Sequence, residues 1–522
     1  MLRYLKIFVI SVLLSIQLIS GCLFFKSASF TLLSYEIIDN EGFPSMKLVF
    51  NVSAPATIII KDPSNQSILS EVYTPGLQTT ILPIGLFRSN PESGFYRILV
   101  LDDQTGDTID EEVLSFKGSD ILITDASFYW LEDKEGYSLL RVNLSIMNNG
   151  DMIVYPNILK LIIDNRTITA YSTPSAVSPG ERTYVNFFMY IDHLDYEEYE
   201  VALSLLGTDH DTLSTKSMKS VPIDNTGTIK YTWIYKNKDY HMELPDPDYL
   251  YTYYSNLPRP ATLDYAAYIF DKYDDDYLLY LKEQIDGITI GLNNDENKRN
   301  LLAAFVQSFQ YSDDKVNDTL YEYPRYPVEM LIDRKGDCED KAILAATLLH
   351  LIGYSTCLLR LPNHMAVGVK YNKTLSLVDE YIDGYYFLET TRYNWEIGQV
   401  PSEYRGISNI TVYPITSRPI LIHRWINATR YTFQNKKDFV QIRLLVDNIG
   451  NANASFQVTG GFFSDSITYN KKEISIDQLQ PDEKRLCVLR IQVPHRVSTI
   501  LRTYILYEDV IVDQHESSSV FN

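Results

Sequence analysis

One cysteine lies at the start of a predicted helix, where its thiol could act as a nucleophile. The segment that begins at Arg334 reads RKGDCEDKAILAATLLHLIG, and alanine, leucine and isoleucine recur in it at spacings of three and four residues. That period predicts a buried helix, with Gly353 as its stop signal. Cys338 therefore falls in the first turn, where free N–H groups and the helix dipole favour a thiolate.

The acids around this cysteine have several possible uses. Asp337 and Asp340 have the spacing of a capping box at the helix start. With Glu339 they also oppose a thiolate by like-charge repulsion, so the thiol needs a cationic partner, and histidine is the usual one. Calcium binding by these three acids and Asp333 is the competing use, but they lack the spacing of a calcium loop. Capping and solvation account for them, so we predict no metal ligand and no cofactor.

A histidine and a carboxylate follow the helix. From Thr356 the pattern changes to strands; His364 opens the second strand and Glu389 falls near the end of the third. A helix followed by antiparallel strands can bring a helix N-terminus and two strand ends together, so thiol, imidazole and carboxylate could meet. Asp383 is the rival acid, but its Asp-Gly sequence with Gly384 predicts a hairpin turn.

These residues, in this order, resemble the transglutaminase-like superfamily, whose fold is related to the papain-type cysteine proteases. GDCEDKA at 336–342 is similar to its Gly-x-Cys-x-x-x-Ala motif, NHMAV at 363–367 to its His-Ala-Trp-type strand, and YFLETT at 386–391 to its Trp-x-x-Asp-Pro-Thr strand. The resemblance spans Arg299 to Arg392. It departs from the family pattern at Glu389, where many members have aspartate, and at Met365-Ala366, where many have Ala-Trp.

The resemblance implies a Cys-His-Glu triad. Cys338 would be the nucleophile, His364 the general base and acid, and Glu389 the carboxylate that orients the imidazole. A thioester intermediate then divides one difficult acyl transfer into two easier steps. An amine acceptor would give crosslinking and water would give hydrolysis, on protein or cell-envelope peptides. The alternative is a non-catalytic surface binding or adhesion protein whose papain-like domain only docks a partner.

The first residues have the pattern of an export signal. Arg3 and Lys6 precede an apolar run at 7–19, and ISGC at 19–22 resembles the lipobox of prokaryotic lipoproteins, in which Cys22 becomes the lipidated first residue. An uncleaved membrane anchor that extends through Phe25 is the other interpretation. Both interpretations place the rest of the chain on the extracytoplasmic face of the cell membrane.

Composition limits the classes of partner. The 522 residues carry a net charge of −21, which argues against nucleic acid as a partner and leaves a protein or peptide substrate and the membrane at the N-terminal anchor. The chain has four cysteines, too few for a disulfide scaffold of this length. Cys357 and Cys487 lie in strand-like segments and are interpreted as small buried hydrophobes.

The domain prediction follows from a change in periodicity along the chain. Short alternating strands with turn residues predict β-sandwiches on both sides of a central region in which helices at 263–285 and 295–311 are expected. The fold class is therefore multidomain, an α+β papain- or transglutaminase-like core flanked by all-β Ig-like sandwiches. The predicted boundaries are 1–22 for the signal, 23–118 for a β-sandwich, 119–222 for an Ig-like sandwich, 223–411 for the transglutaminase-like domain and 412–522 for a last Ig-like sandwich.

The second and last sandwiches share two turn patterns. NNGD at 148–151 corresponds to NIGN at 448–451, and PGE at 179–181 corresponds to PDE at 481–483. We interpret the two as divergent copies of one Ig-like module, similar to the adhesion-related modules of prokaryotic surface proteins.

Overall fold

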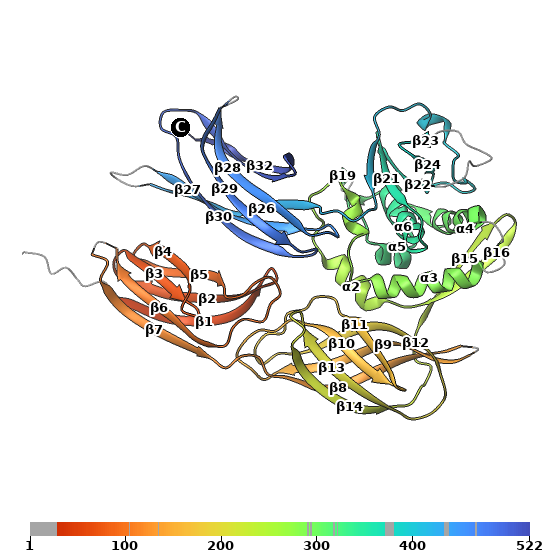
Figure 1. Cartoon of the computed structure of the whole chain (residues 1–522), viewed down its shortest axis with the longest axis horizontal. Coiled ribbons are helices and arrows are strands. Elements are labelled where there is room, and N and C mark those ends of the chain that lie inside the picture. The colour runs from red at the N-terminus through yellow and green to blue at the C-terminus, as the bar shows by residue number, and fades with distance from the viewer. Residues whose placement is uncertain are drawn as a thin grey trace, which may run out of the picture.

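The protein consists of three β-sandwiches and one α+β unit (Figure 1). The computed structural model describes residues 29–521 apart from 104, 134, 290–291, 293–294, 317–318, 321, 371–380, 433–437 and 465–466. It confirms the predicted multidomain class. The predicted export signal and Cys22 lie outside the described residues. Within the described ranges, no helix has the length and hydropathy of a membrane span.

All three sandwiches have the same strand topology. In each, the first, second and fifth strands form a three-stranded sheet, and the other four form a sheet in the order fourth, third, sixth, seventh. The sequence indicated kinship only for the second and last sandwiches, because the first lacks their turn patterns.

The strand bounds of the first sandwich are β1 (Phe30–Asn40), β2 (Phe43–Val52), β3 (Ala56–Lys61), β4 (Ser67–Tyr73), β5 (Gly76–Pro83), β6 (Gly94–Asp102) and β7 (Thr108–Phe116). Those of the second are β8 (Ile121–Asp133), β9 (Gly136–Asn148), β10 (Pro156–Ile163), β11 (Arg166–Tyr171), β12 (Arg182–Leu194), β13 (Tyr199–Gly207) and β14 (Thr212–Ser220). Those of the last are β26 (Leu421–Tyr431), β27 (Phe439–Asn448), β28 (Ala454–Ser464), β29 (Ile467–Leu479), β30 (Lys484–Gln492), β31 (Thr499–Tyr507) and β32 (Val510–Phe521).

One asparagine-centred turn recurs in the second and last sandwiches. The Asn148 amide nitrogen donates to the carbonyls of Met152 at 2.8 Å and Val177 at 3.0 Å, and its oxygen accepts the Gly150 N–H at 3.0 Å. Asn448 makes the three corresponding bonds at 2.8, 3.0 and 3.2 Å. A Cβ on the glycine of either turn would lie 2.3 Å from a backbone atom, so both turns require glycine. This shared network supports the interpretation of the two as copies of one module.

The second shared turn has glycine in one sandwich and aspartate in the other. Gly180 and Asp482 both have left-handed backbone conformations, with φ of 74° and 57°, and each N–H bonds the backbone carbonyl of the turn asparagine at 2.8 Å. An aspartate in this conformation is less favourable than glycine. The Asp482 carboxylate, however, lies 2.7 Å from Arg88 of the first sandwich and also bonds the Tyr273 hydroxyl of the α+β unit.

The four units form a closed ring (Figure 1). Besides the Asp482 contact, the first and last sandwiches are joined by ion pairs of Glu41 with Arg424 and Glu71 with Arg443. The second sandwich packs on the α+β unit through Phe188, whose ring centre lies 5.4 Å from that of Tyr277.

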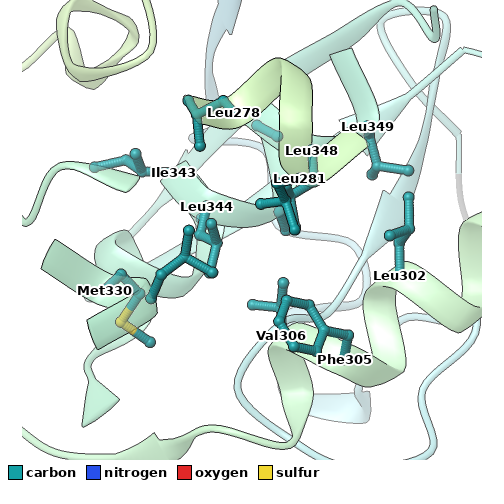
Figure 2. Packing of buried hydrophobic residues seen from close by; sticks show 14 of the residues in the cluster. Leu278, Leu281, Leu302, Phe305, Val306, Met330, Ile343, Leu344, Leu348 and Leu349 are labelled. Atoms are coloured by element: carbon teal, nitrogen blue, oxygen red, sulfur yellow. The ribbon is translucent and has the colours of Figure 1, made fainter. Parts of the chain in front are cut away.

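The α+β unit is organised around a buried helix, α6 (Cys338–Leu351). Figure 2 shows its apolar side chains facing those of α3, α4 and α5. The other elements are β15 (Thr228–Tyr235), β16 (Lys238–Pro245), α2 (Asp248–Asn256), the 3-10 helix η1 (Tyr265–Tyr268), α3 (Asp275–Thr289), α4 (Asp295–Gln307), β17 (Gln310–Tyr311), β18 (Lys315–Val316), β19 (Thr319–Leu320), α5 (Pro327–Asp333) and β20 (Lys335–Gly336).

The prediction of a single helix at 263–285 was wrong. The segment contains η1 and the first part of α3, and the chain turns between them. The Asp264 carboxylate accepts the Ala266 N–H at 3.3 Å and that of Asp271 accepts the Tyr273 N–H at 3.0 Å. Such local side-chain bonds compete with helix formation. The helix predicted at 295–311 also ends early, because the chain pairs at β17 with β20.

A five-stranded antiparallel sheet lies against α6. Its order is β23-β24-β22-β21-β25, from β21 (Thr356–Leu361), β22 (His364–Val369), β23 (Tyr381–Ile382), β24 (Tyr385–Leu388) and β25 (Thr411–Pro414), with the 3-10 helix η2 (Ser402–Tyr404) before β25. Because β25 pairs with β21, the sheet continues past the predicted boundary at residue 411.

Candidate active site

Cys338 is the first residue of α6, as the sequence predicted. The Asp340 carboxylate accepts the Asp337 N–H at 3.2 Å, which is one half of the predicted capping box. Gly336 is required just before the helix, because a Cβ there would lie 2.4 Å from the Asp340 carboxylate and 2.9 Å from the Met330 sulfur. The glycine of the motif therefore lets the helix start pack against α5.

The Cys338 thiol is half-buried and bonded to an acid. Its Sγ donates to Glu339 Oε2 at 3.1 Å. Burial is the largest cause that raises the pKa of Cys338, and the negative charges of Glu339 and Asp337 raise it further. A hydrogen bond from the backbone of Met365 acts in the opposite direction, which places the sulfur beside the first residues of β22.

His364 is positioned by a tight turn between β21 and β22. Leu361 pairs with His364, and the two residues between them are proline and an asparagine, Asn363, with φ of 61°. Proline followed by a residue of positive φ is the type II turn pattern. The imidazole is buried, and its Nε2 lies 3.1 Å from Glu389 Oε2. The bond to the carboxylate therefore uses Nε2 and leaves the other ring nitrogen, Nδ1, for a different partner.

Glu389 follows β24 directly and is completely buried. The β22–β24 register pairs Val367 with Leu388, so the two-residue alternation puts Glu389 on the same face as His364. Glu389 Oε1 accepts both the N–H and the hydroxyl of Thr391, at 2.7 and 2.6 Å. Burial raises the pKa of Glu389, but the bonds from His364 and Thr391 outweigh it and hold the pKa below its usual value.

A family model matches the part of the chain that contains these three residues. Residues 283–413 match a family model described as a transglutaminase-like domain. The chain contains a transglutaminase-like domain. This match confirms the resemblance deduced from the three motifs, whereas no curated protein matches the chain by sequence.

Three solved structures that are similar to the chain align with it at low scores. Red sea bream transglutaminase aligns with 72% of this chain and 79% of its own length, at 10% identity and a TM-score of 0.16. The GH2 beta-galacturonidase of Eisenbergiella tayi aligns with 40% of this chain at 10% identity and a TM-score of 0.17, and the chain covers 45% of that enzyme. The exo-chitosanase CsxA of Amycolatopsis orientalis aligns with 91% of this chain and 76% of its own length, at 8% identity and a TM-score of 0.16. Scores this low carry no argument about function.

Tyr404 of η2 is a residue of the transglutaminase-like domain that the sequence analysis missed. Its ring stacks on the His364 imidazole with centroids 4.5 Å apart and an interplanar angle of 1°. Burial raises the pKa of Tyr404, and the negative charges of Glu389, Glu403 and Cys338 raise it further. No sequence signal marks it, because it lies in an irregular segment.

Two buried polar side chains link the start of α6 to the end of α4 and the end of α4 to Glu389. Gln307, at the end of α4, donates to the backbone carbonyl of Glu389 at 2.8 Å. Lys341, in the first turn of α6, donates to the carbonyl of Phe309 at 2.7 Å. Burial lowers the pKa of Lys341 to about 8. These contacts fix the start of α6 relative to Glu389.

The structure therefore brings two of the three predicted residues into direct contact and places the third beside them. His364 and Glu389 are bonded, whereas the Cys338 thiol is bonded to Glu339, and among the described contacts no hydrogen bond joins sulfur and imidazole. The rival acid Asp383 lies in the β23–β24 hairpin turn, as predicted, with φ of 47° there and 83° at Gly384.

Proposed function

We propose that Cys338, His364 and Glu389 form a catalytic triad for acyl transfer through a thioester. The observation that carries this proposal is the buried His364–Glu389 hydrogen bond, at strand ends beside the first turn of the Cys338 helix. An ionised carboxylate on Nε2 fixes the imidazole tautomer and leaves Nδ1 as the nitrogen for the thiol proton. The family match supports a cysteine-dependent chemistry.

The steps follow from these roles. His364 takes the thiol proton as the Cys338 sulfur attacks the carbonyl carbon of an amide, and the carbonyl oxygen becomes an oxyanion. The Cys338 N–H at the helix N-terminus is a donor for that oxyanion. When the C–N bond breaks, His364 gives the proton to the leaving nitrogen and a thioester remains. Water or a second amine, deprotonated by His364, then releases the acyl group and restores the thiol.

We extend the proposal to the location and substrate of the enzyme. An export signal with Cys22 as a lipidated residue, or an uncleaved anchor, would hold the chain on the extracytoplasmic face of the membrane. Its substrates there would be proteins or cell-envelope peptides. The sequence pattern at 1–25 is the support for this part of the proposal.

One observation favours the alternative of a non-catalytic docking domain. The thiol donates to Glu339, and burial together with neighbouring acids raises its pKa, which opposes thiolate formation. In that case the transglutaminase-like domain would bind a partner without acyl transfer.

Alkylation with iodoacetamide at pH 7 separates the two functions. A catalytic thiol should be labelled stoichiometrically in the folded protein, and Cys338→Ala should remove the label. Cys357→Ala is the matched control and should keep it, because Cys357 is completely buried. Incorporation of a fluorescent amine into a glutamine peptide, with release of ammonia in its absence, then distinguishes crosslinking from hydrolysis. A thiol that stays unlabelled until unfolding would favour the docking function.

A further inference from the structure

One face of α4 carries two buried amides in place of apolar side chains. Asn300 and Gln307 are only 2% and 1% exposed, and they are seven residues apart, which places them two turns apart on the same side of the helix. Burial of an amide is costly unless the group is hydrogen-bonded. Both amides are bonded to segment 389–397, which follows β24 and contains no helix or strand.

Gln307 holds this segment at two points. Its amide nitrogen donates to the carbonyl of Glu389 at 2.8 Å and to the carbonyl of Trp395 at 2.9 Å, so both amide hydrogens are used on main-chain acceptors. Asn300 holds the segment further along the chain, where its oxygen accepts the Ile397 N–H at 2.9 Å. Among the described hydrogen bonds of the two amides, only those of Gln307 reach a residue of the proposed triad.

The main chain of Gln307 is bonded to the nucleophile helix. Its carbonyl lies 3.4 Å from the ammonium group of Lys341, which is completely buried and also donates to the Phe309 carbonyl at 2.7 Å. Lys341 follows Cys338 by three residues in α6. Gln307 is therefore bonded through its main chain to the Cys338 helix and through its side chain to Glu389.

The carbonyl that Gln307 holds belongs to the residue whose carboxylate contacts the imidazole. β24 ends at Leu388, so Glu389 lies beyond the strand pairing that fixes the rest of this chain segment. The Glu389 carboxylate bonds His364 with one oxygen and Thr391, of the same segment, with the other. A shift of the Glu389 main chain would thus move the carboxylate relative to His364, and the contact that opposes such a shift comes from α4.

We propose that Gln307 is a positioning residue of the triad, which holds the Glu389 carboxylate against His364 at a fixed distance from the Cys338 helix. The inference rests on the proposed function, because positioning affects a rate only where the triad is catalytic. A displacement of about 1 Å in such a group costs ~10²-fold in rate. Since Gln307 is buried behind Glu389, its removal should lower kcat and leave KM unchanged.

The kinetic test compares two substitutions on the same face of α4. Gln307→Met keeps the length of the side chain and removes both donors, so kcat for incorporation of a fluorescent amine into a glutamine peptide should fall about 10²-fold. Asn300→Leu is the matched control, because it removes an equally buried amide that is bonded to the same segment. It should lower the melting temperature by a similar amount and change kcat less than twofold. An equal loss of kcat in both variants, or no loss in Gln307→Met, would overturn the proposal.

A spectroscopic readout separates positioning from the proposed reaction. The proton between His364 Nε2 and Glu389 should give a downfield proton NMR resonance that is absent from His364→Ala. This resonance should shift or disappear in Gln307→Met and persist in Asn300→Leu. If it does so in a protein that transfers no acyl group, the proposed function fails and the positioning role is supported.

The outcome that contradicts the positioning role is equally specific. Absence of the resonance from the wild type, or an unchanged resonance in Gln307→Met, would overturn the proposal. Gln307→Asn, whose amide is one methylene shorter, replaces Gln307→Met if that variant does not fold. The same shift of the resonance is expected in Gln307→Asn, because the shorter side chain cannot reach both carbonyls.

Discussion

The imidazole half and the nucleophile half of the candidate active site differ in how their acids are partnered. Glu389 is bonded on one oxygen by His364 and on the other by Thr391, and its pKa is held below its usual value. Glu339 lies among acids instead, and burial together with Glu322 and Asp337 raises its pKa well above its usual value. The first half is complete within the protein, whereas the second needs a bound proton to balance its charge.

This contrast indicates where control of the reaction would lie. The acid–base pair is held by strand pairing and a fixed turn, so it is present before any ligand arrives. The thiol is bonded to an acid whose own charge depends on its surroundings. Changes in pH should therefore act on Cys338 more than on His364.

The largest expected effect comes from removing the imidazole of His364. His364→Ala removes the only group proposed to move protons, so kcat/KM for amine incorporation should fall by about 10³–10⁴-fold. His350→Ala is the control, since His350 lies exposed in the last turn of α6 and its substitution should leave the rate unchanged. Equal rates for wild type and His364→Ala would place the base elsewhere.

Substitution of the carboxylate should have the next largest effect. Glu389→Gln keeps the shape but removes the charge that fixes the tautomer, so kcat/KM should fall by about 10²–10³-fold. A lowered pKa means that Glu389 adds stability above its unfolded pKa and loses it as pH falls. The variant should therefore show a weaker loss of stability between pH 5 and 3 in thermal melts. Asp383→Asn, in the hairpin turn, should match wild type; a rate loss there instead would move the third role to Asp383.

Removal of the stacked ring should have a moderate effect. Tyr404→Leu loses an aromatic contact worth about 0.5–1.5 kcal/mol, so kcat should fall by roughly 2–10-fold. Tyr404→Phe keeps the ring and should retain the wild-type rate. A loss of equal size in both variants would show that the hydroxyl, not the stacking, matters.

The smallest expected effect comes from a substitution in the nucleophile half, Glu339→Gln. Because the pKa of Glu339 is raised in the folded state, the folded protein binds more protons than the unfolded chain as the pH rises above about 4. Its contribution to stability is thus present at low pH and lost as pH rises. Glu339→Gln removes this loss, and at pH 8 the domain should melt roughly 2–4 °C higher, as ~1 kcal/mol gives at this size. Asp509→Asn, at an exposed acid in the turn between β31 and β32, should leave this slope unchanged.

The sequence predicted those features that local rules determine. The start of α6, the hairpin at Asp383 and the strand that begins at His364 follow from periodicity, capping and turn residues, and the structure confirms these elements. The strand predicted to contain Glu389 ends one residue before it, at Leu388. The partners of these residues could not be predicted, because they come from irregular segments. Tyr404 reaches the site only through the tertiary fold, and the chain near it has no periodic pattern.

The helix prediction failed for a related reason. At 263–285 the apolar spacing is helical, but aspartate side chains bond neighbouring N–H groups and turn the chain between η1 and α3. The common topology of the three sandwiches was likewise hidden, because only two of them share the asparagine turn.

The contacts of the Asp482 turn would help to hold the fragments of a proteolysed protein together. Because the last sandwich is bonded to the first through Asp482, Arg443 and Arg424, a proteolytic nick in the linker after β14 would leave two fragments still held together at their far ends. Those bonds are largely ionic and partly exposed, so added salt would weaken them. A nicked protein should therefore migrate as one particle in dilute buffer and separate more readily in concentrated salt.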